Sequence, residues 1–230
     1  MSPSPSIVAA SLALTACLAA CAPDTRAERS ASSGADGSSA SFVIDHFGDT
    51  VPVVPARRIV SMMPATTEIL FAIGAGDRLV GRSEFDKWPD SALAVPNLGP
   101  GLRPNVEAIL AANADLVILY GSADNRAAAR RLRQAGVTTA AFKVDSIEQF
   151  DRITRLLGRL TGDSARGAFV ADTVLRTLDS VRMATSGLPR VRVVVPANDQ
   201  PLLVIGGGSF VSQLIEIAGG INVYDSITHP

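Results

Sequence analysis

The residue types that carry most enzyme and metal chemistry are scarce in this chain. Its 230 residues include two histidines, His46 and His229, and two cysteines, Cys17 and Cys21. Two histidines so far apart do not supply the several His, Asp or Glu ligands of a zinc or manganese site. There is no Gly-x-Ser-x-Gly sequence, and His46 is far from any serine that would serve as a nucleophile. We therefore expect no catalytic residues, no bound metal and no cofactor.

An apolar segment at the front of the chain is typical of an export signal. No Asp, Glu, Lys or Arg precedes Asp24, and residues 7–21 are almost all small or apolar. About 15 such residues suit the core of a signal peptide, whereas a membrane-spanning helix needs about 20. The segment ends in Leu-Ala-Ala-Cys at Cys21, which resembles the bacterial lipobox, whose cysteine is lipidated and becomes the new amino terminus. Leu-Thr-Ala-Cys at Cys17 has the same form, and a buried apolar helix is the competing interpretation. We expect a signal peptide over residues 1–20 and lipidation at Cys21.

A stretch rich in Ser, Gly and Ala follows the signal. Residues 29–39 are mostly of these three types, a composition that buries too little apolar surface to fold. We expect a flexible tether over residues 21–41. The signal, the lipid-accepting cysteine and the tether together predict a lipid-anchored protein whose folded part lies outside the cytoplasmic membrane.

Apolar strands and amphipathic helices alternate along the rest of the chain. Short apolar runs, such as residues 58–61 and 116–119, have the composition of buried parallel strands. Segments with apolar residues at helical spacing separate them, such as residues 146–160, and Asn105 and Ser209 are candidate caps of two others. This alternation predicts an α/β fold with mostly parallel sheets. The net charge of −1 argues against a nucleic-acid-binding protein.

One pattern occurs twice. In residues 66–76 an apolar helix, for which Thr66 and Thr67 are candidate caps, ends at a pair of glycines and precedes a short apolar strand. Residues 209–220 repeat this order. A long helix over residues 164–184 separates the two copies. We therefore expect two lobes joined by one rigid helix, with boundaries at residues 42–160, 161–188 and 189–230.

Three motifs resemble those of the periplasmic substrate-binding proteins that deliver cobalamin and iron–siderophores to ABC importers. They begin at Arg58, Asn105 and Gly206 and occur in the family's order. The first is Arg-Ile-Val-Ser-Met-Met-Pro-Ala-Thr-Thr-Glu-Ile-Leu-Phe-Ala-Ile-Gly, the second contains Asn-Val-Glu-Ala-Ile-Leu, and the third contains Gly-Gly-Gly-Ser-Phe. The resemblance covers the chain from about Phe42 onwards. It implies a non-catalytic monomer that binds a small molecule between two lobes, with an ABC permease and its ATPase as partners.

Five residues are candidates for contact with that ligand. Ligands of open parallel sheets bind beyond the carboxyl ends of the strands, which places Pro64 and Ala65 at the cleft. Gly101 lies in a loop that we expect at the cleft rim. Phe85 and Trp88 are either cleft contacts or anchors of their loop, and the resemblance implies a ligand-stacking aromatic residue near Phe85.

Several charged residues have two interpretations each. The resemblance implies that Glu107 forms an ion pair with an arginine of the permease, whereas the helix dipole alone also favours a carboxylate in a first helical turn. Four arginines would favour an anionic ligand if they faced the cleft, although solvated surface is the simpler expectation for each. These are Arg57, Arg58, Arg82 and Arg103.

Several ligands and functions remain open. Hydrophobic cleft loops with an aromatic residue suit the flat face of a corrinoid, so we favour cobalamin over a ferric siderophore. A haem protein needs an axial Tyr or His, and Tyr120, Tyr224 and His229 are available, though none lies in a recognisable haem motif. Alternatives of another class are a scaffold or sensor lipoprotein without transport and, with less support, an enzyme.

The internal repeat also predicts an incomplete second lobe. The sequence ends at Pro230, where the counterpart of residues 105–119 would follow. We therefore expect a C-terminally truncated binding protein.

Overall fold

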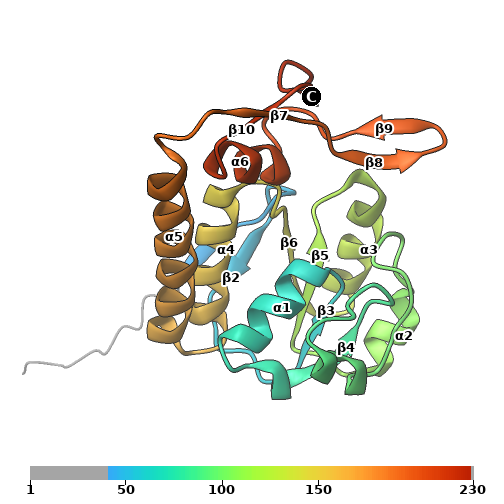
Figure 1. Ribbon diagram of the computed structural model, residues 1–230. Coiled ribbons are helices and arrows are strands. Elements are labelled where there is room, and N and C mark those ends of the chain that lie inside the picture. The colour runs from blue at the N-terminus through green and yellow to red at the C-terminus, as the bar shows by residue number, and fades with distance from the viewer. Residues whose placement is uncertain (1–40, 229–230) are drawn as a thin grey trace, which may run out of the picture. The chain divides into compact units, whose positions relative to one another are not determined.

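The computed structural model describes residues 41–228 (Figure 1). The predicted signal peptide, both cysteines, the tether up to residue 40 and His229 lie outside the described residues. No helix within residues 41–228 combines the length and the apolar character needed to cross a membrane. The helices and strands are β1 (Phe42–Ile44), β2 (Thr50–Pro52), β3 (Ile59–Ser61), α1 (Pro64–Ala72), β4 (Leu79–Arg82), α2 (Val106–Ala111), β5 (Leu116–Tyr120), α3 (Ala123–Gln134), β6 (Thr138–Phe142), α4 (Ile147–Leu160), α5 (Ser164–Thr185), β7 (Val191–Val193), β8 (Pro196–Asp199), β9 (Leu202–Val204), α6 (Phe210–Ile217) and β10 (Gly220–Asn222).

A four-stranded parallel sheet forms the first half of the fold, in the order β4-β3-β5-β6. Successive residues of a strand point to opposite faces, so Leu116 and Ile118 pack under α1 and α4, while Val117 and Leu119 pack under α2 and α3. The chain passes from β3 through α1 to β4 on one side and from β5 through α3 to β6 on the other. The strand order therefore reverses between β3 and β5. The predicted α/β fold with a parallel sheet is confirmed.

Three helices begin at a side-chain cap, and two of these caps, Asn105 and Ser209, were predicted. The side chains of Asn105, Ser146 and Ser209 each accept a hydrogen bond from the backbone N–H three residues later, at 3.1 to 3.2 Å. Such caps satisfy a backbone donor that has no partner within the helix. Local sequence chemistry therefore determines the starts of α2, α4 and α6.

The expected capping role of Thr66 and Thr67 is wrong. Helix α1 begins at Pro64, and its N-cap residue, Met63, makes no side-chain capping bond. Proline suits the first helical position because its φ is already helical and the N–H it lacks would have no helical partner. The two threonines are buried inside the helix, and Thr66 Oγ1 donates to the Met63 carbonyl at 3.0 Å.

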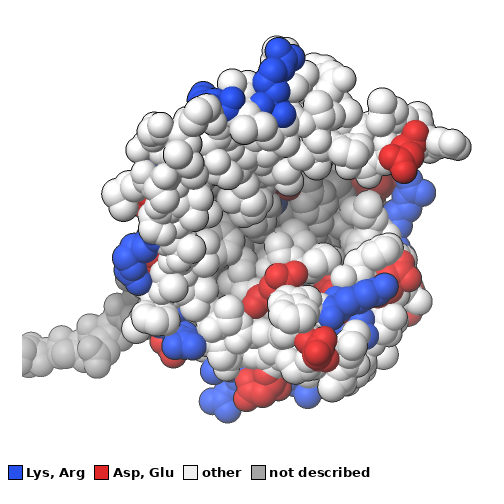
Figure 2. All heavy atoms as spheres, viewed as in Figure 1, with Lys and Arg blue, Asp and Glu red and all other residues white. Residues whose placement is uncertain are grey.

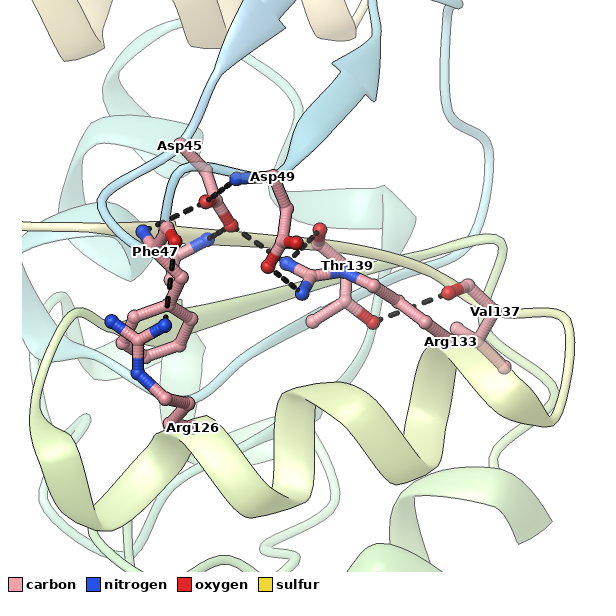
Figure 3. A network of polar contacts seen from close by, with 8 residues as sticks. Asp45, Phe47, Asp49, Arg126, Arg133, Val137 and Thr139 are labelled. Carbon is pink, nitrogen blue, oxygen red and sulfur yellow. Dashed lines mark hydrogen bonds and ion pairs between the residues drawn. The ribbon is translucent and has the colours of Figure 1, made fainter.

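The β1–β2 hairpin lies against the edge strand β6. The His46 N–H donates to the Ala141 carbonyl at 2.8 Å, and the Ala141 N–H donates to Asp45 Oδ2 at 3.1 Å. Figure 3 shows the guanidinium of Arg133 directed at the carboxylates of Asp45 and Asp49, with 2.7 Å between Arg133 Nη2 and Asp45 Oδ2. The hairpin thus covers part of an edge that would otherwise expose unpaired backbone groups.

The long helix α5 lies beside α4 and leads to the last elements (Figure 1). Strand β7 pairs in parallel with β10, and β8 and β9 form an antiparallel hairpin. Helix α6 contacts both earlier helices: Thr185 Oγ1 donates to the Ile217 carbonyl at 2.9 Å, and the Ile147 N–H donates to Gln213 Oε1 at 2.8 Å. These bonds fix α6 above the amino end of α4.

Candidate ligand-binding site

A hollow of about 360 Å³ opens at the carboxyl ends of β3 and β5. The strand order reverses at this place, and open α/β sheets bind ligands at such reversals. Three of the five predicted contact residues, Pro64, Phe85 and Gly101, line it together with Leu102 and Tyr120. A Cβ atom on Gly101 would lie 2.5 Å from the Met62 carbonyl oxygen, so the loop that carries Gly101 can approach β3 this closely only with glycine there.

A larger hollow of about 770 Å³ adjoins the first. The other two predicted residues, Ala65 and Trp88, line it, so the neighbours Pro64 and Ala65 border one hollow each. Its walls come from α1, α4, α5, α6 and the loop that carries Trp88. Figure 2 shows this face of the molecule hollowed at its middle, with walls formed mainly by uncharged residues. The apolar lining side chains include Ile69, Phe71, Val144, Phe150, Val170, Val174 and Phe210.

A buried carboxylate holds the loop that carries the two aromatic residues. Asp86 is fully buried, and it accepts hydrogen bonds from Ser83 Oγ at 2.5 Å and from Thr67 Oγ1 at 2.6 Å. On either side of it, Phe85 and Trp88 expose 64% and 63% of their surface. Asp86 therefore holds this loop from inside, while the side chains of Phe85 and Trp88 are exposed on it.

Sequence reasoning missed Asp86 and its role. The only signal is an acidic residue within an aromatic loop, and such residues are usually solvated. Its partner Thr67 is 19 residues away, and nothing in the spacing predicts that the two side chains meet.

Glu68 is the one ionisable carboxylate among the residues that line the larger hollow. Burial raises the pKa of Glu68 above its ordinary value, and the negative charge of Asp86 raises it further. A carboxyl group in this setting is more stable when it is neutral or when a ligand donates hydrogen bonds to it. When it is ionised, the Glu68 carboxylate repels an anion that binds beside it.

The four arginines that would have favoured an anionic ligand line neither hollow. Arg58 donates to the carbonyls of residues 112 and 113, both at 2.8 Å. Arg82 is buried, and its guanidinium donates to the carbonyls of Ser83, Ala92 and Val95. Arg103 forms an exposed ion pair with an aspartate of α3 at 3.2 Å. Their positive charge is therefore not available to a ligand in either hollow.

Tyr120, one of the residues that the sequence offers as an axial haem ligand, lines the smaller hollow. Its hydroxyl donates to the Asp145 carboxylate at 3.2 Å. Burial raises the pKa of Tyr120, and the charge of Asp145 raises it further, so the phenolate form is disfavoured. Residues 41–228 contain no group of three or more His, Cys, Asp or Glu side chains that could hold a metal ion.

Glu107 is exposed in the first turn of α2. Its Oε1 lies 2.7 Å from Nη2 of Arg131 on α3, and both side chains are mostly exposed to solvent. The helix-terminal backbone N–H lowers the pKa of Glu107, and Arg131 lowers it further. Glu107 is therefore an ionised surface carboxylate whose exposed ion pair can be exchanged for another at little cost.

Comparison with known proteins gives consistent matches. Residues 59–229 match the protein family described as periplasmic binding protein. The vitamin B12-binding protein of Vibrio cholerae is 26% identical over 170 residues, which cover 74% of this chain. The chain spans 62% of the length of that relative.

Solved structures share the fold. The periplasmic vitamin B12 binding protein BtuF of Vibrio cholerae superposes with a TM-score of 0.67 at 26% identity, covering 76% of this chain and 69% of that one. The periplasmic haem-binding protein RhuT from Roseiflexus in its apo form gives a TM-score of 0.65 at 29% identity, covering 73% of this chain and 65% of that one. The relatives are thus substrate-binding proteins for two different macrocycles.

Proposed function

The chain belongs to the periplasmic binding protein family, and from this premise we propose that it is an extracytoplasmic lipoprotein that captures cobalamin or a related corrinoid. It delivers this ligand to the permease of an ABC importer, which an ATPase drives. Cys21 carries the lipid, and the two adjoining hollows form one binding surface with Pro64, Ala65, Phe85, Trp88 and Gly101.

The observation that carries this proposal is the chemistry of the two hollows. Among the residues that the structure describes, the lining is mostly apolar and aromatic, it includes no Lys or Arg, and Glu68 is its one charged side chain. A corrinoid presents a flat macrocycle, on which exposed aromatic side chains can stack. Its amide side chains carry N–H groups that can donate hydrogen bonds to the Glu68 carboxylate. Shape and polarity therefore favour a large ligand with amide groups over a small anion.

Haem is the second candidate, and Tyr120 in the smaller hollow is the observation in its favour. Two features oppose it. The environment of Tyr120 disfavours the phenolate that binds iron, and the Glu68 carboxylate repels haem propionates. Ferric siderophores with anionic groups meet the same difficulty, because no Lys or Arg of residues 41–228 lines the hollows.

Fluorescence titration tests the proposal directly, because Trp88 is the only tryptophan in the chain. We expect saturable quenching by cyanocobalamin, with Phe85→Ala weakening the affinity by about tenfold through the loss of one stacked ring. Phe42→Ala is the matched control, since Phe42 is similarly exposed at 57% but lies on the distant hairpin. Absence of a response to cyanocobalamin, haem and ferric siderophores alike would contradict an importer function.

The same titration separates corrinoid from haem. If Glu68 repels propionates, Glu68→Gln should strengthen haem binding by about fivefold, the effect of roughly 1 kcal/mol of screened repulsion. The cyanocobalamin affinity should change by less than about twofold, because a glutamine oxygen still accepts an amide N–H. If the wild-type protein binds haem more tightly than cyanocobalamin, haem and not a corrinoid is the preferred ligand.

Glu107 is proposed to dock on the permease by exchanging Arg131 for an arginine of that partner. Glu107→Ala should therefore reduce corrinoid uptake in cells while leaving the Trp88 titration unchanged. Uptake at the wild-type level would show that docking uses another surface.

A further inference from the structure

A third hollow, a groove of about 730 Å³, lies between the β1–β2 hairpin and α4. One wall is formed by hairpin residues 43–46, and the other by the end of β6 and one face of α4. The groove shares no lining residue with either hollow of the proposed ligand site. Unlike those two, it is lined by several cationic side chains.

Three of these cations are not neutralised within the fold. Lys143, Arg152 and Arg159 line the groove, and none has a carboxylate partner within 4.0 Å among residues 41–228. Arg159 makes only a hydrogen bond to Ser41 Oγ, at 3.1 Å. By contrast Arg155, which also lines the groove, is paired with two carboxylates and contributes no free charge.

The acidic residues of the groove are already engaged. The side chain of Asp45 is fully buried and forms its ion pair with Arg133, outside the groove lining. Asp151 pairs with Arg155 at 2.8 Å. The groove therefore keeps a positive excess although the chain as a whole has a net charge of −1.

The cationic residues of the groove are spread along α4. Lys143 lies just before the helix, and Arg152 and Arg159 are seven residues apart, two turns along the same face, or about 10 Å. Gln149 lies between Lys143 and Arg152 in the sequence. Its Oε1 accepts a hydrogen bond from the Asp145 N–H at 2.7 Å, which leaves its amide NH₂ group free to donate. This row of donors matches a ligand with more than one anionic oxygen cluster.

His46 lies on the opposite wall of the groove, and the positive charge there affects the pKa of its side chain. Burial is the largest cause that lowers the pKa of His46, and Lys143 and Arg126 lower it further, while Asp45 and Asp145 act in the opposite direction. An anion seated in the groove would offset the effect of Lys143.

We propose that this groove is a second binding site, which takes phosphate groups, with Arg152 and Arg159 as the main ligands and Lys143 and Gln149 as supporting donors. Arginine forms paired hydrogen bonds with phosphate, and lysine binds it as a point charge. The same chemistry is offered by a free polyphosphate and by the headgroups of anionic phospholipids. The site is independent of the ligand that occupies the other two hollows.

Two measurements on the full chain test this site and its source of phosphate. Isothermal titration with inorganic pyrophosphate, in a buffer without phosphate, probes the free anion. Co-sedimentation with phosphatidylcholine vesicles, with and without phosphatidylglycerol, probes headgroups, and the increment caused by phosphatidylglycerol is the quantity compared. The test variant is Arg152→Ala/Arg159→Ala, and Arg176→Ala, an exposed arginine of α5 outside the groove, is the matched control.

We expect the double variant to weaken pyrophosphate binding or to reduce the phosphatidylglycerol increment by about tenfold, and the control to change neither by more than about twofold. A response to pyrophosphate alone assigns the site to a free anion, and a response to vesicles alone assigns it to lipid. If neither probe binds, or if Arg176→Ala loses as much as the double variant, the proposal is overturned. The Trp88 titration with cyanocobalamin should be the same in all variants, which keeps this result separate from the proposed transport function.

Discussion

A βαβ unit near the beginning of the fold, β3–α1–β4, has a counterpart near its end, β7–α6–β10. Each is a pair of parallel strands with an apolar helix between them in the sequence, and the second also carries the β8–β9 hairpin before its helix. The two units agree in local detail. Each helix is followed by a glycine with positive φ, Gly74 at 81° and Gly219 at 78°.

The units also share a polar clamp. In the first, Thr67 of α1 donates to Asp86, which follows β4, at 2.6 Å. In the second, Ser212 of α6 donates to Asp225, which follows β10, at 2.9 Å. In both, a hydroxyl from the start of the helix binds a carboxylate from the loop after the second strand.

Burial separates the two units. Strand β3 lies between β4 and β5, and Ile59 is fully buried, whereas β7 pairs only with β10 within residues 41–228 and Val191 is 65% exposed. The clamps differ likewise, because Asp86 is buried and Asp225 is exposed. The same βαβ arrangement therefore forms a buried core only where a second neighbouring strand and helices on both faces cover its first strand.

The largest expected difference between the units concerns their first strands. Ile59→Ala should lower the free energy of unfolding by about 3–4 kcal/mol, because it leaves a cavity in a packed core. Val191→Ala, at the corresponding place in the second unit, should cost less than about 0.5 kcal/mol, as exposed substitutions do. Urea denaturation followed by circular dichroism measures both, and equal losses would show that β7 is as well covered as β3.

The two clamps should differ by a smaller amount. Asp86→Ala should cost about 2 kcal/mol, because the buried hydroxyls of Ser83 and Thr67 lose their acceptor. Asp225→Ala should cost less than about 1 kcal/mol, because water can replace the exposed carboxylate. Thermal unfolding of both variants provides the measurement. Asp86→Asn, which keeps an acceptor, serves as the control and should recover part of the loss.

The smallest expected effects concern the two glycines that end the helices. Gly74→Ala should cost about 1 kcal/mol from the strained φ alone, since nothing lies within 4 Å of an added Cβ. Gly219→Ala should cost somewhat more, because the Cβ would also lie 3.1 Å from Cβ of Thr185. Gly187→Ala, with neither a positive φ nor a close neighbour, should be neutral in the same melting experiment. A neutral Gly219→Ala would mean that the end of α6 can rearrange.

Much of the fold was predictable because it depends on neighbours in the sequence. Asn105, Ser146 and Ser209 cap the backbone three residues away, and the uninterrupted apolar run of residues 116–119 is enough to assign a buried strand. The carboxyl ends of parallel strands meet at one edge, which was enough to predict where Pro64 and Ala65 lie, and each of them lines one of the two hollows. The failure at Thr66 and Thr67 has a local cause too, because Pro64 already satisfies the start of α1.

Short-range periodicity, caps and motifs were enough to establish the order of strands and helices, the repeated unit and the family. Long-range packing buries Asp86 beneath an aromatic loop, puts Phe85 and Trp88 beside adjoining hollows, and keeps four arginines outside them. Long-range packing also brings Lys143, Arg152 and Arg159 to one groove, where they have no carboxylate partner among residues 41–228. Each of these outcomes depends on which distant side chains exclude water together, and that depends on packing rather than on spacing along the chain.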